Sequence, residues 1–156
     1  MRCLLWQAEG MKMKKIGFVI PWFGWDIPGG AEAELRGLVS HLTASGQEVE
    51  ILTTCVRQFG SDWNVNYHKA GTRVERGVTI RRFKVRKRDK SGFAKVNRKL
   101  MANELPLTAE EEATYAREMV NSQALYDYLR ERQEEYSLYV FIPYMFGTTY
   151  YGIQQC

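Results

Sequence analysis

Four short segments of this chain are rich in hydrophobic residues and are separated by longer stretches of mixed polarity. They lie at residues 16–20, 48–54, 78–85 and 138–142, and Pro21 and Pro143 end the first and the last. Segments of this length with so much apolar character predict β-strands that are buried on both faces. Residues 55–77 contain no such segment and are predicted to form a long loop.

Between these segments, hydrophobic residues recur at helical spacing. Four of them predict a helix over residues 31–45, which Gly46 ends: Leu35, Leu38, Val39 and Leu42. Thr108 and Glu111 form a capping-box pattern, which predicts the start of a second helix that runs to about residue 135. Shorter helices are predicted near residues 94–101 and within residues 150–156.

The order of strands and helices predicts the fold class. Apolar strands that are separated by helices favour a parallel sheet with helices on both faces. Right-handed crossovers then give an open, Rossmann-like α/β sheet, which is expected to be incomplete at the C-terminus because the last residues only begin a helix. The predicted organisation is an N-terminal extension at residues 1–13 and one partial domain at residues 14–156.

Composition excludes several classes of protein. The 156 residues are 45% hydrophobic and include 7 Phe, 9 Tyr and 4 Trp, which is too much apolar material for a disordered chain. The three cysteines, Cys3, Cys55 and Cys156, are far apart, so they predict neither a disulfide scaffold nor a metal site. A reduced, cytoplasmic protein without a transmembrane helix is therefore expected. The two histidines, His41 and His68, are interpreted as structural or solvated.

Charge is distributed unevenly along the chain. Residues 73–99 hold 12 basic and 2 acidic side chains, whereas residues 104–135 hold 9 acidic and 3 basic ones. The basic block favours either a solvated surface or contact with nucleic acid, an anionic membrane or a phosphorylated ligand. Within it, Arg82, Lys84 and Arg86 are expected to share one exposed strand face while Phe83 and Val85 pack inward.

The most specific chemical signal is a glycine pair at the junction of the first strand and the first helix. Gly29 and Gly30 follow the loop after the first strand, where glycine allows a ligand to approach the backbone closely. The helix N-terminus offers free N–H groups to an anion. The loop lacks the spacing of a dinucleotide fingerprint and the lysine of a P-loop, so neither of those sites is predicted.

From residue 14 onward, the chain resembles the N-terminal domain of a GT-B fold glycosyltransferase of family 4, the group 1 type. The resemblance rests on the first strand, the Gly-Gly-Ala-Glu block at residues 29–32, the helix that ends at Gly46 and the second strand. Residues 77–85 and 138–152 resemble the third strand, the fourth strand and the following turn of that family.

The resemblance implies that the chain is part of an enzyme that moves a sugar from a nucleotide-sugar donor to a sugar or lipid-linked acceptor. Gly29, Gly30, Ala31 and Glu32 would lie near the donor diphosphate. The acceptor would contact a second group of residues, which holds Trp22, Phe23, Trp25 and Asp26. No tightly bound cofactor and no metal are expected.

The chain departs from the family pattern in two places. The family often carries a histidine after the fourth strand, whereas this turn has none and offers only Tyr144, Thr148 and Thr149 as replacements. No catalytic residue is therefore predicted. The C-terminal, donor-binding domain of the family is also absent from these 156 residues, so the fragment is expected to be inactive by itself.

The basic block leaves a second interpretation open. A Rossmann-like module could use the block to bind nucleic acid or an anionic membrane. Phe83 and Phe93 are the only aromatic residues in the block, which disfavours a platform for nucleic-acid bases. A weak contact with the inner face of a membrane is compatible with both interpretations.

Overall fold

A five-stranded sheet forms the centre of the computed structural model, which describes residues 14–156. The spatial order of the strands is β3-β4-β2-β1-β5. Their bounds are β1 (Lys15–Ile20), β2 (Val49–Thr54), β3 (Gly71–Glu75), β4 (Val78–Phe83) and β5 (Tyr136–Phe141). All neighbouring pairs are parallel except β3 and β4, which are antiparallel. The four parallel strands therefore follow the order third, second, first, fourth that is typical of doubly wound sheets.

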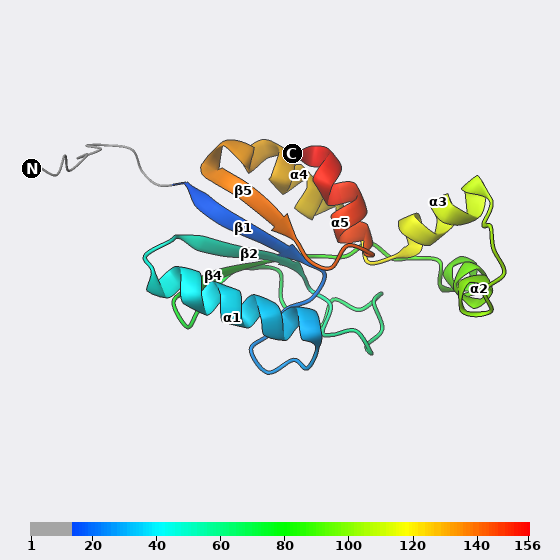
Figure 1. Cartoon of the computed structure of the whole chain (residues 1–156), viewed down its shortest axis with the longest axis horizontal. Coiled ribbons are helices and arrows are strands. Elements are labelled where there is room, and N and C mark those ends of the chain that lie inside the picture. The colour runs from blue at the N-terminus through cyan, green and yellow to red at the C-terminus, as the bar shows by residue number, and fades with distance from the viewer. Residues whose placement is uncertain (1–13) are drawn as a thin grey trace, which may run out of the picture.

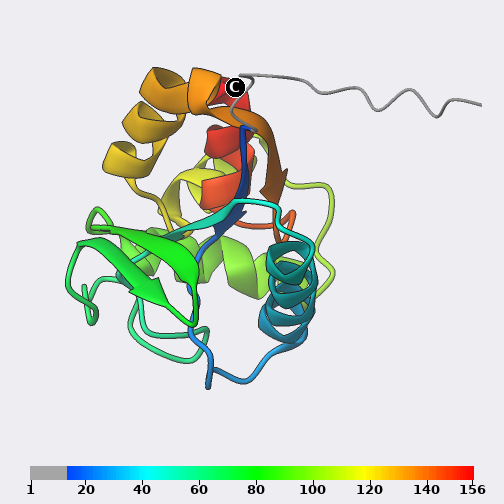
Figure 2. The same cartoon turned by 90° about the vertical axis from the view of Figure 1, so that its left-hand side faces the viewer.

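Helices cover both faces of the sheet, as the sequence predicts. Figures 1 and 2 show α1 (Gly30–Ala44) on one face and α4 (Gln123–Arg132) and α5 (Gly147–Gly152) on the other. Leu35 and Val39 of α1 pack against Ile51 of β2 on the first face. Leu125 and Leu129 of α4 pack with other side chains on the second face. The Rossmann-like α/β fold class is confirmed.

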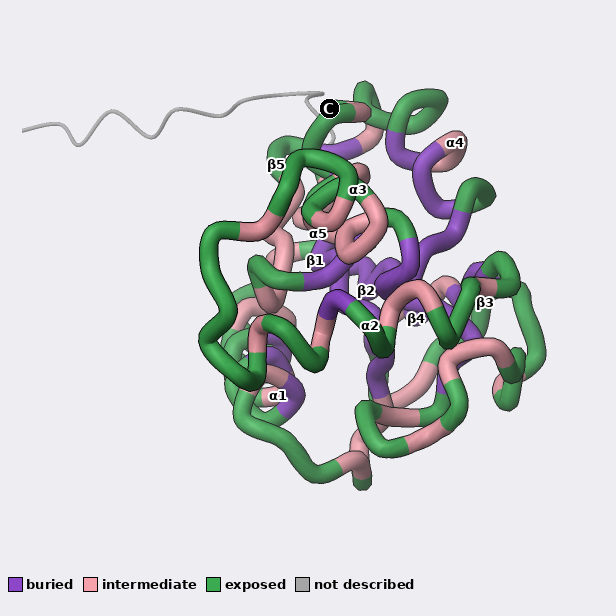
Figure 3. The backbone as a smooth tube through the Cα atoms, turned by 90° about the vertical axis from the view of Figure 1, so that its right-hand side faces the viewer, coloured by how far each residue is buried: buried purple, intermediate pink, exposed green. Residues whose placement is uncertain are grey.

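Two further helices lie beyond the carboxyl ends of the parallel strands. α2 (Lys90–Met101) and α3 (Ala109–Glu118) pack on each other there, in front of the buried strands in the view of Figure 3. Two short 3₁₀ helices complete the structure, η1 (Gln133–Glu135) and η2 (Ile153–Gln155). Asp89 starts α2 by accepting a hydrogen bond from the Ser91 N–H, so this helix begins four residues before the predicted position.

The single helix predicted from Thr108 to about residue 135 is wrong at its centre. The capping box at Thr108 and Glu111 is present, but α3 ends at Glu118 and α4 begins at Gln123. Asn121 donates to the carbonyl oxygens of Arg117 and Met119, which closes the end of α3, and Ser122 caps α4. These short polar side chains satisfy backbone groups that a continuous helix would otherwise use, so the helix divides here.

The predicted long loop at residues 55–77 is also wrong in part, because it contains β3. Arg76 and Gly77 both have positive φ angles, as a two-residue hairpin turn requires, and they connect β3 to β4. β3 adds a fifth strand at the outer edge of β4. As a result β4 is an inner strand, and this changes the surroundings of its arginines.

Candidate functional site

The sheet has its topological switch point between β1 and β5. The chain leaves β1 through α1 toward β2 on one side, and β5 pairs with β1 on the other side. Ligands of open α/β sheets bind outside the carboxyl ends of the strands at such a point, because the two connecting loops diverge there. A pocket of about 460 Å³ lies at this position, between residues 28–32 and residues 143–146. We call it the switch-point pocket.

The glycine pair lies in the switch-point pocket at the N-terminus of α1, where the sequence places it. Gly29 has a φ angle of 144°, and an added Cβ would overlap the Glu32 carboxylate, so this position requires glycine. An added Cβ at Gly30 would meet nothing within 4 Å. Gly30 therefore keeps open a space that a ligand can enter.

Glu32 is held inside the molecule beside the glycines. Its side chain is buried and accepts a hydrogen bond from the Trp22 indole N–H. The carboxylate lies in the first turn of α1, where the positive end of the helix dipole stabilises it. Glu32 therefore fixes the loop and also brings a negative charge to the pocket wall.

Aromatic side chains form the floor of this region. The Trp22 ring contacts the rings of Phe59, Trp63 and Phe146, with centroid distances of 5.8, 5.9 and 4.9 Å. These residues come from the β1–α1 loop, the β2–β3 loop and the start of α5. The cluster thus joins three connections at the carboxyl edge into one rigid wall.

The turn after β5 contributes less than the sequence predicts. Tyr144 is 83% exposed and does not line the pocket. Thr148 is fully buried, and Thr149 donates its hydroxyl proton to the Pro143 carbonyl oxygen at 2.7 Å. The turn supplies Pro143, Met145 and Phe146 to the switch-point pocket instead, so the side chains offered as replacements for a histidine lie outside its lining.

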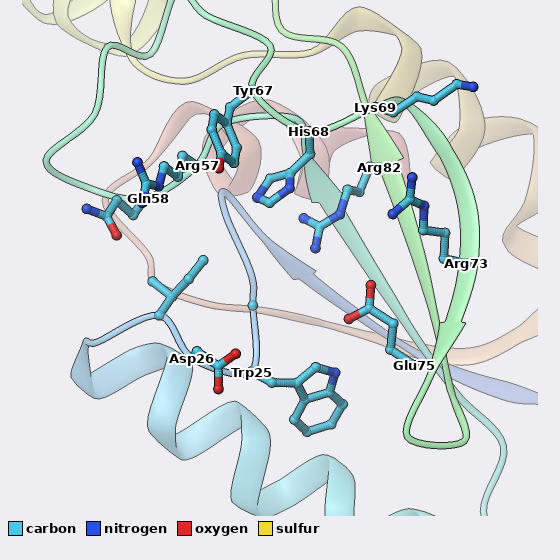
Figure 4. A pocket seen from close by; sticks show the side chains of 12 residues that line it. Trp25, Asp26, Arg57, Gln58, Tyr67, His68, Lys69, Arg73, Glu75 and Arg82 are labelled. Atoms are coloured by element: carbon cyan, nitrogen blue, oxygen red, sulfur yellow. The ribbon is translucent and has the colours of Figure 1, made fainter.

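The residues predicted on the acceptor side separate into three locations. Trp22 lines the switch-point pocket, whereas Phe23 is 0% exposed and belongs to the core under α1. Phe23 therefore offers no surface to a ligand, which corrects the expectation. Trp25 and Asp26 line a second pocket of about 480 Å³ beside β3 and β4, which is shown in Figure 4.

The second pocket is rich in arginine, and we call it the arginine pocket. Four cationic and two acidic side chains line it: Arg57, Lys69, Arg73, Arg82, Asp26 and Glu75. Arg82 is 7% exposed, because β4 alternates and directs Val78, Ile80 and Arg82 to the face that α1 covers. The expectation that Arg82 shares an exposed face with Lys84 and Arg86 is wrong, because Arg82 lies on the covered face of β4, whereas Lys84 and Arg86 follow the end of the strand and are exposed. The sequence contains a signal for this burial, because Arg82 lies two residues after the apolar Ile80 and so points to the same face of the strand.

Much of the remaining basic block is used inside the protein. Arg81 donates to Glu50 at 2.7 Å, and Arg86 pairs with Glu118 at 3.3 Å. Arg88 donates to the Glu118 carbonyl oxygen and stacks over the rings of Trp63 and Phe93. Lys84 and Lys87 are exposed. The surface charge offered to nucleic acid or a membrane is thus smaller than the composition suggests.

Residues 14–156 contain no group of three metal-ligating side chains that could hold an ion. No helix in this part of the chain has both the length and the apolar character to cross a membrane. Cys55 is buried and Cys156 is exposed, and Cys3 lies outside the described residues.

The fold and the site define an α/β protein of Rossmann-like type with two adjacent pockets at the carboxyl edge of its sheet. Comparisons of the chain with known protein families, with curated proteins and with solved structures find no match.

Proposed function

We propose that this chain is the N-terminal, acceptor-side part of a GT-B glycosyltransferase, which moves a sugar from a nucleotide-sugar to an acceptor. One observation carries the proposal: the switch-point pocket lies between the Gly29–Gly30 loop and the turn after β5. This is the position at which an open α/β sheet binds small molecules. The reaction proposed for this pocket is taken from the family resemblance of residues 29–32.

The lining of the switch-point pocket fits an uncharged, hydroxyl-bearing acceptor. Phe59, Met145 and Phe146 provide apolar surface for the C–H faces of a sugar ring. The Glu32 carboxylate can accept a hydroxyl proton in a hydrogen bond. The same negative charge opposes direct contact with a diphosphate, so the proposal places the acceptor next to Glu32 and the diphosphate farther along the free N–H groups of α1.

Sugar transfer by a GT-B enzyme needs a second wall that holds the donor. Positioning of the two reactants and stabilisation of the leaving diphosphate both depend on groups from each side of the cleft. Residues 14–156 supply one wall. We therefore expect the purified chain to bind an acceptor or a nucleotide-sugar without transferring the sugar.

The test uses two glycines of the same helix. Gly30→Ala adds a methyl group to the switch-point pocket, and Gly37→Ala adds one to an exposed position of α1, with no steric conflict at either site. Saturation-transfer NMR with a panel of simple glycosides and nucleotide-sugars measures binding. We expect Gly30→Ala to weaken ligand binding about tenfold. A methyl group that occupies space needed by a packed ligand costs roughly 1–3 kcal/mol of binding free energy.

Gly37→Ala is the matched control and should bind as the unchanged protein does. If no compound of the panel binds to the unchanged protein, the proposal is wrong. Equal affinities for the two alanine variants would also contradict it, because the ligand would then bind elsewhere.

A further inference from the structure

The arginine pocket contains a buried cation without an acidic partner. The Arg82 Nη2 donates to the Phe23 carbonyl oxygen at 2.9 Å, but the buried Nη1 has no hydrogen-bond partner. Among residues 14–156, no acidic side chain lies within ion-pair distance of Arg82. A buried and unpaired charge is unfavourable, so a structure that keeps one generally uses it.

Other polar atoms of the pocket are also without hydrogen-bond partners. The His68 Nε2 is buried without a partner, and so is the Trp25 indole N–H. Figure 4 shows His68 and Arg82 directed into the same space, with Arg73 on the neighbouring strand. The His68 backbone N–H donates to the Cys55 carbonyl oxygen at 2.9 Å, which fixes the loop that carries this imidazole.

Electrostatics in the pocket favour an anion. Burial lowers the pKa of Arg82, the Glu75 carboxylate acts in the opposite direction from beyond ion-pair distance, and the charge of Arg73 acts in the same direction as burial. Burial, followed by the Arg82 charge, lowers the pKa of His68, so the imidazole is neutral and can donate one hydrogen bond. Arg57, Arg73 and Lys69 add positive charge without forming an ion pair with Asp26 or Glu75.

We propose that the arginine pocket binds the phosphoryl group of a small phosphorylated molecule, with Arg82 and Arg73 as its charged donors and His68 as a neutral donor. Forked guanidinium groups match the geometry of phosphate oxygens and form charge-assisted hydrogen bonds with them. The pocket volume of about 480 Å³ exceeds that of a phosphate ion, so the remainder of the ligand would lie toward Asp26 and Gln58. This site is separate from the switch-point pocket and does not depend on the proposed sugar transfer.

The experiment is a proton NMR titration of the untagged protein with inorganic phosphate at constant ionic strength. The chain has two histidines, so its imidazole signals report on two positions: His68 in the pocket and the exposed His41 on α1. We expect phosphate to shift the His68 signals in a saturable way and to leave the His41 signals unchanged. Bound phosphate should also raise the pKa of His68, because an anion stabilises the imidazolium form.

Two charge-neutralising variants distinguish a built site from general attraction. Arg73→Gln removes a pocket arginine from an exposed strand position, and Lys87→Gln removes an exposed charge of the basic block outside the pocket. We expect Arg73→Gln to weaken phosphate binding about tenfold, as the loss of a charge-assisted hydrogen bond predicts, and Lys87→Gln to change it less than about twofold.

Three results would overturn the proposal. The first is that the His68 signals show no saturable shift at phosphate concentrations up to about 100 mM, which is about a hundred times the Kd of a weak, millimolar anion site. The second is equal weakening by Arg73→Gln and Lys87→Gln. The third is that acetate binds as tightly as phosphate, because the site would then select carboxylates or any anion rather than a phosphoryl group.

Discussion

Arg81 and Arg82 are neighbours on β4, yet they lie in opposite electrostatic surroundings. Arg81 points to the face that α4 covers and pairs with the buried Glu50, whereas Arg82 points to the face of α1 and has no acidic partner. Glu50 is 1% exposed and also accepts the Tyr136 hydroxyl proton at 2.7 Å and a bond from Lys15 at 3.4 Å. One side of the strand therefore holds a satisfied network, and the other holds an open pocket.

The comparison separates charges that stabilise the fold from charges that are available to a ligand. Around Glu50, the side chains of Arg81, Lys15 and Tyr136 all have partners within the protein, and burial together with the hydrogen bonds to Tyr128 and Glu50 raises the pKa of Tyr136. The neighbouring Tyr139 hydroxyl is buried without a partner, but it carries no charge at neutral pH. Around Arg82, three buried nitrogen atoms have no hydrogen-bond partner: Arg82 Nη1, His68 Nε2 and the Trp25 indole nitrogen. Since buried polar groups are nearly always paired, the unpaired set indicates where an external partner belongs.

The largest effect is expected at Glu50. Glu50→Ala removes the acceptor that Arg81, Lys15 and Tyr136 share, and it should lower the free energy of unfolding by about 3 kcal/mol, because breaking a buried charge network leaves the partner charges uncompensated. Urea denaturation followed by tryptophan fluorescence measures the change. Glu48→Ala, at an exposed position just before β2, is the control and should stay within about 0.5 kcal/mol. Equal losses of stability in the two variants would show that the Glu50 network does not stabilise the fold.

A smaller effect is expected at the glycine pair. Gly29→Ala should lower the free energy of unfolding by about 2 kcal/mol, because alanine is strained at a φ of 144° and its methyl group would overlap Glu32. Gly30→Ala should leave stability unchanged or raise it by up to about 1 kcal/mol. Thermal unfolding of both variants checks the difference. Loss of stability in both would show that the open space beside Gly30 is incorrectly described.

The smallest effect concerns pH. Burial, and then Arg82, lowers the pKa of His68, with Arg73 and Arg57 acting in the same direction and Glu75 against them. As the pH falls, His68 therefore binds a proton in the unfolded chain before it does so in the folded protein. The free energy of unfolding should decrease below about pH 6.5, by under about 1 kcal/mol. Urea midpoints at pH 7.5 and 5.5 measure this change. His68→Gln should reduce the difference, whereas His41→Gln should not. Identical pH dependence in both variants would contradict the description of the arginine pocket.

Much of the fold could be predicted from the sequence. The apolar segments locate β1, β2, β4 and β5, and for β1, β2 and β4 the reason is that buried strands need hydrophobic residues on both faces. The expectation that residues 138–142 are buried on both faces is wrong, because β5 is an edge strand on which Leu138 is 47% exposed. β3 was missed because its residues are mostly exposed and it exists only through pairing with β4. The break between α3 and α4 was missed because hydrophobic periodicity reveals neither the local hydrogen bond from Asn121 to the Arg117 carbonyl oxygen nor the tertiary one from Ser122 to the Lys84 carbonyl oxygen.

The candidate site was predictable in part. The position of Gly29 and Gly30 follows from the order of strand, loop and helix. The arginine pocket could not be found in this way, because it depends on β3 and on the packing of the β2–β3 loop against Trp25 and Asp26. Charge counting placed Arg82 in a solvated block, whereas the structure buries it on the face of β4 that α1 and the β1–α1 loop cover.

The most direct test of this account compares the thermal unfolding of Arg81→Met and Arg82→Met with and without inorganic phosphate. Arg81→Met should lower the unfolding midpoint by about 5 °C or more, because it leaves Glu50 with one cation fewer, and should retain the rise that phosphate causes. The free energy of unfolding of Arg82→Met should stay within about 1 kcal/mol of that of the unchanged protein, because the substitution removes an unpaired charge. The variant should lose the phosphate-induced rise, because it also lacks the main hydrogen-bond donor to phosphate. A full phosphate-induced rise in Arg82→Met, or an equal loss of that rise in both variants, would contradict the account.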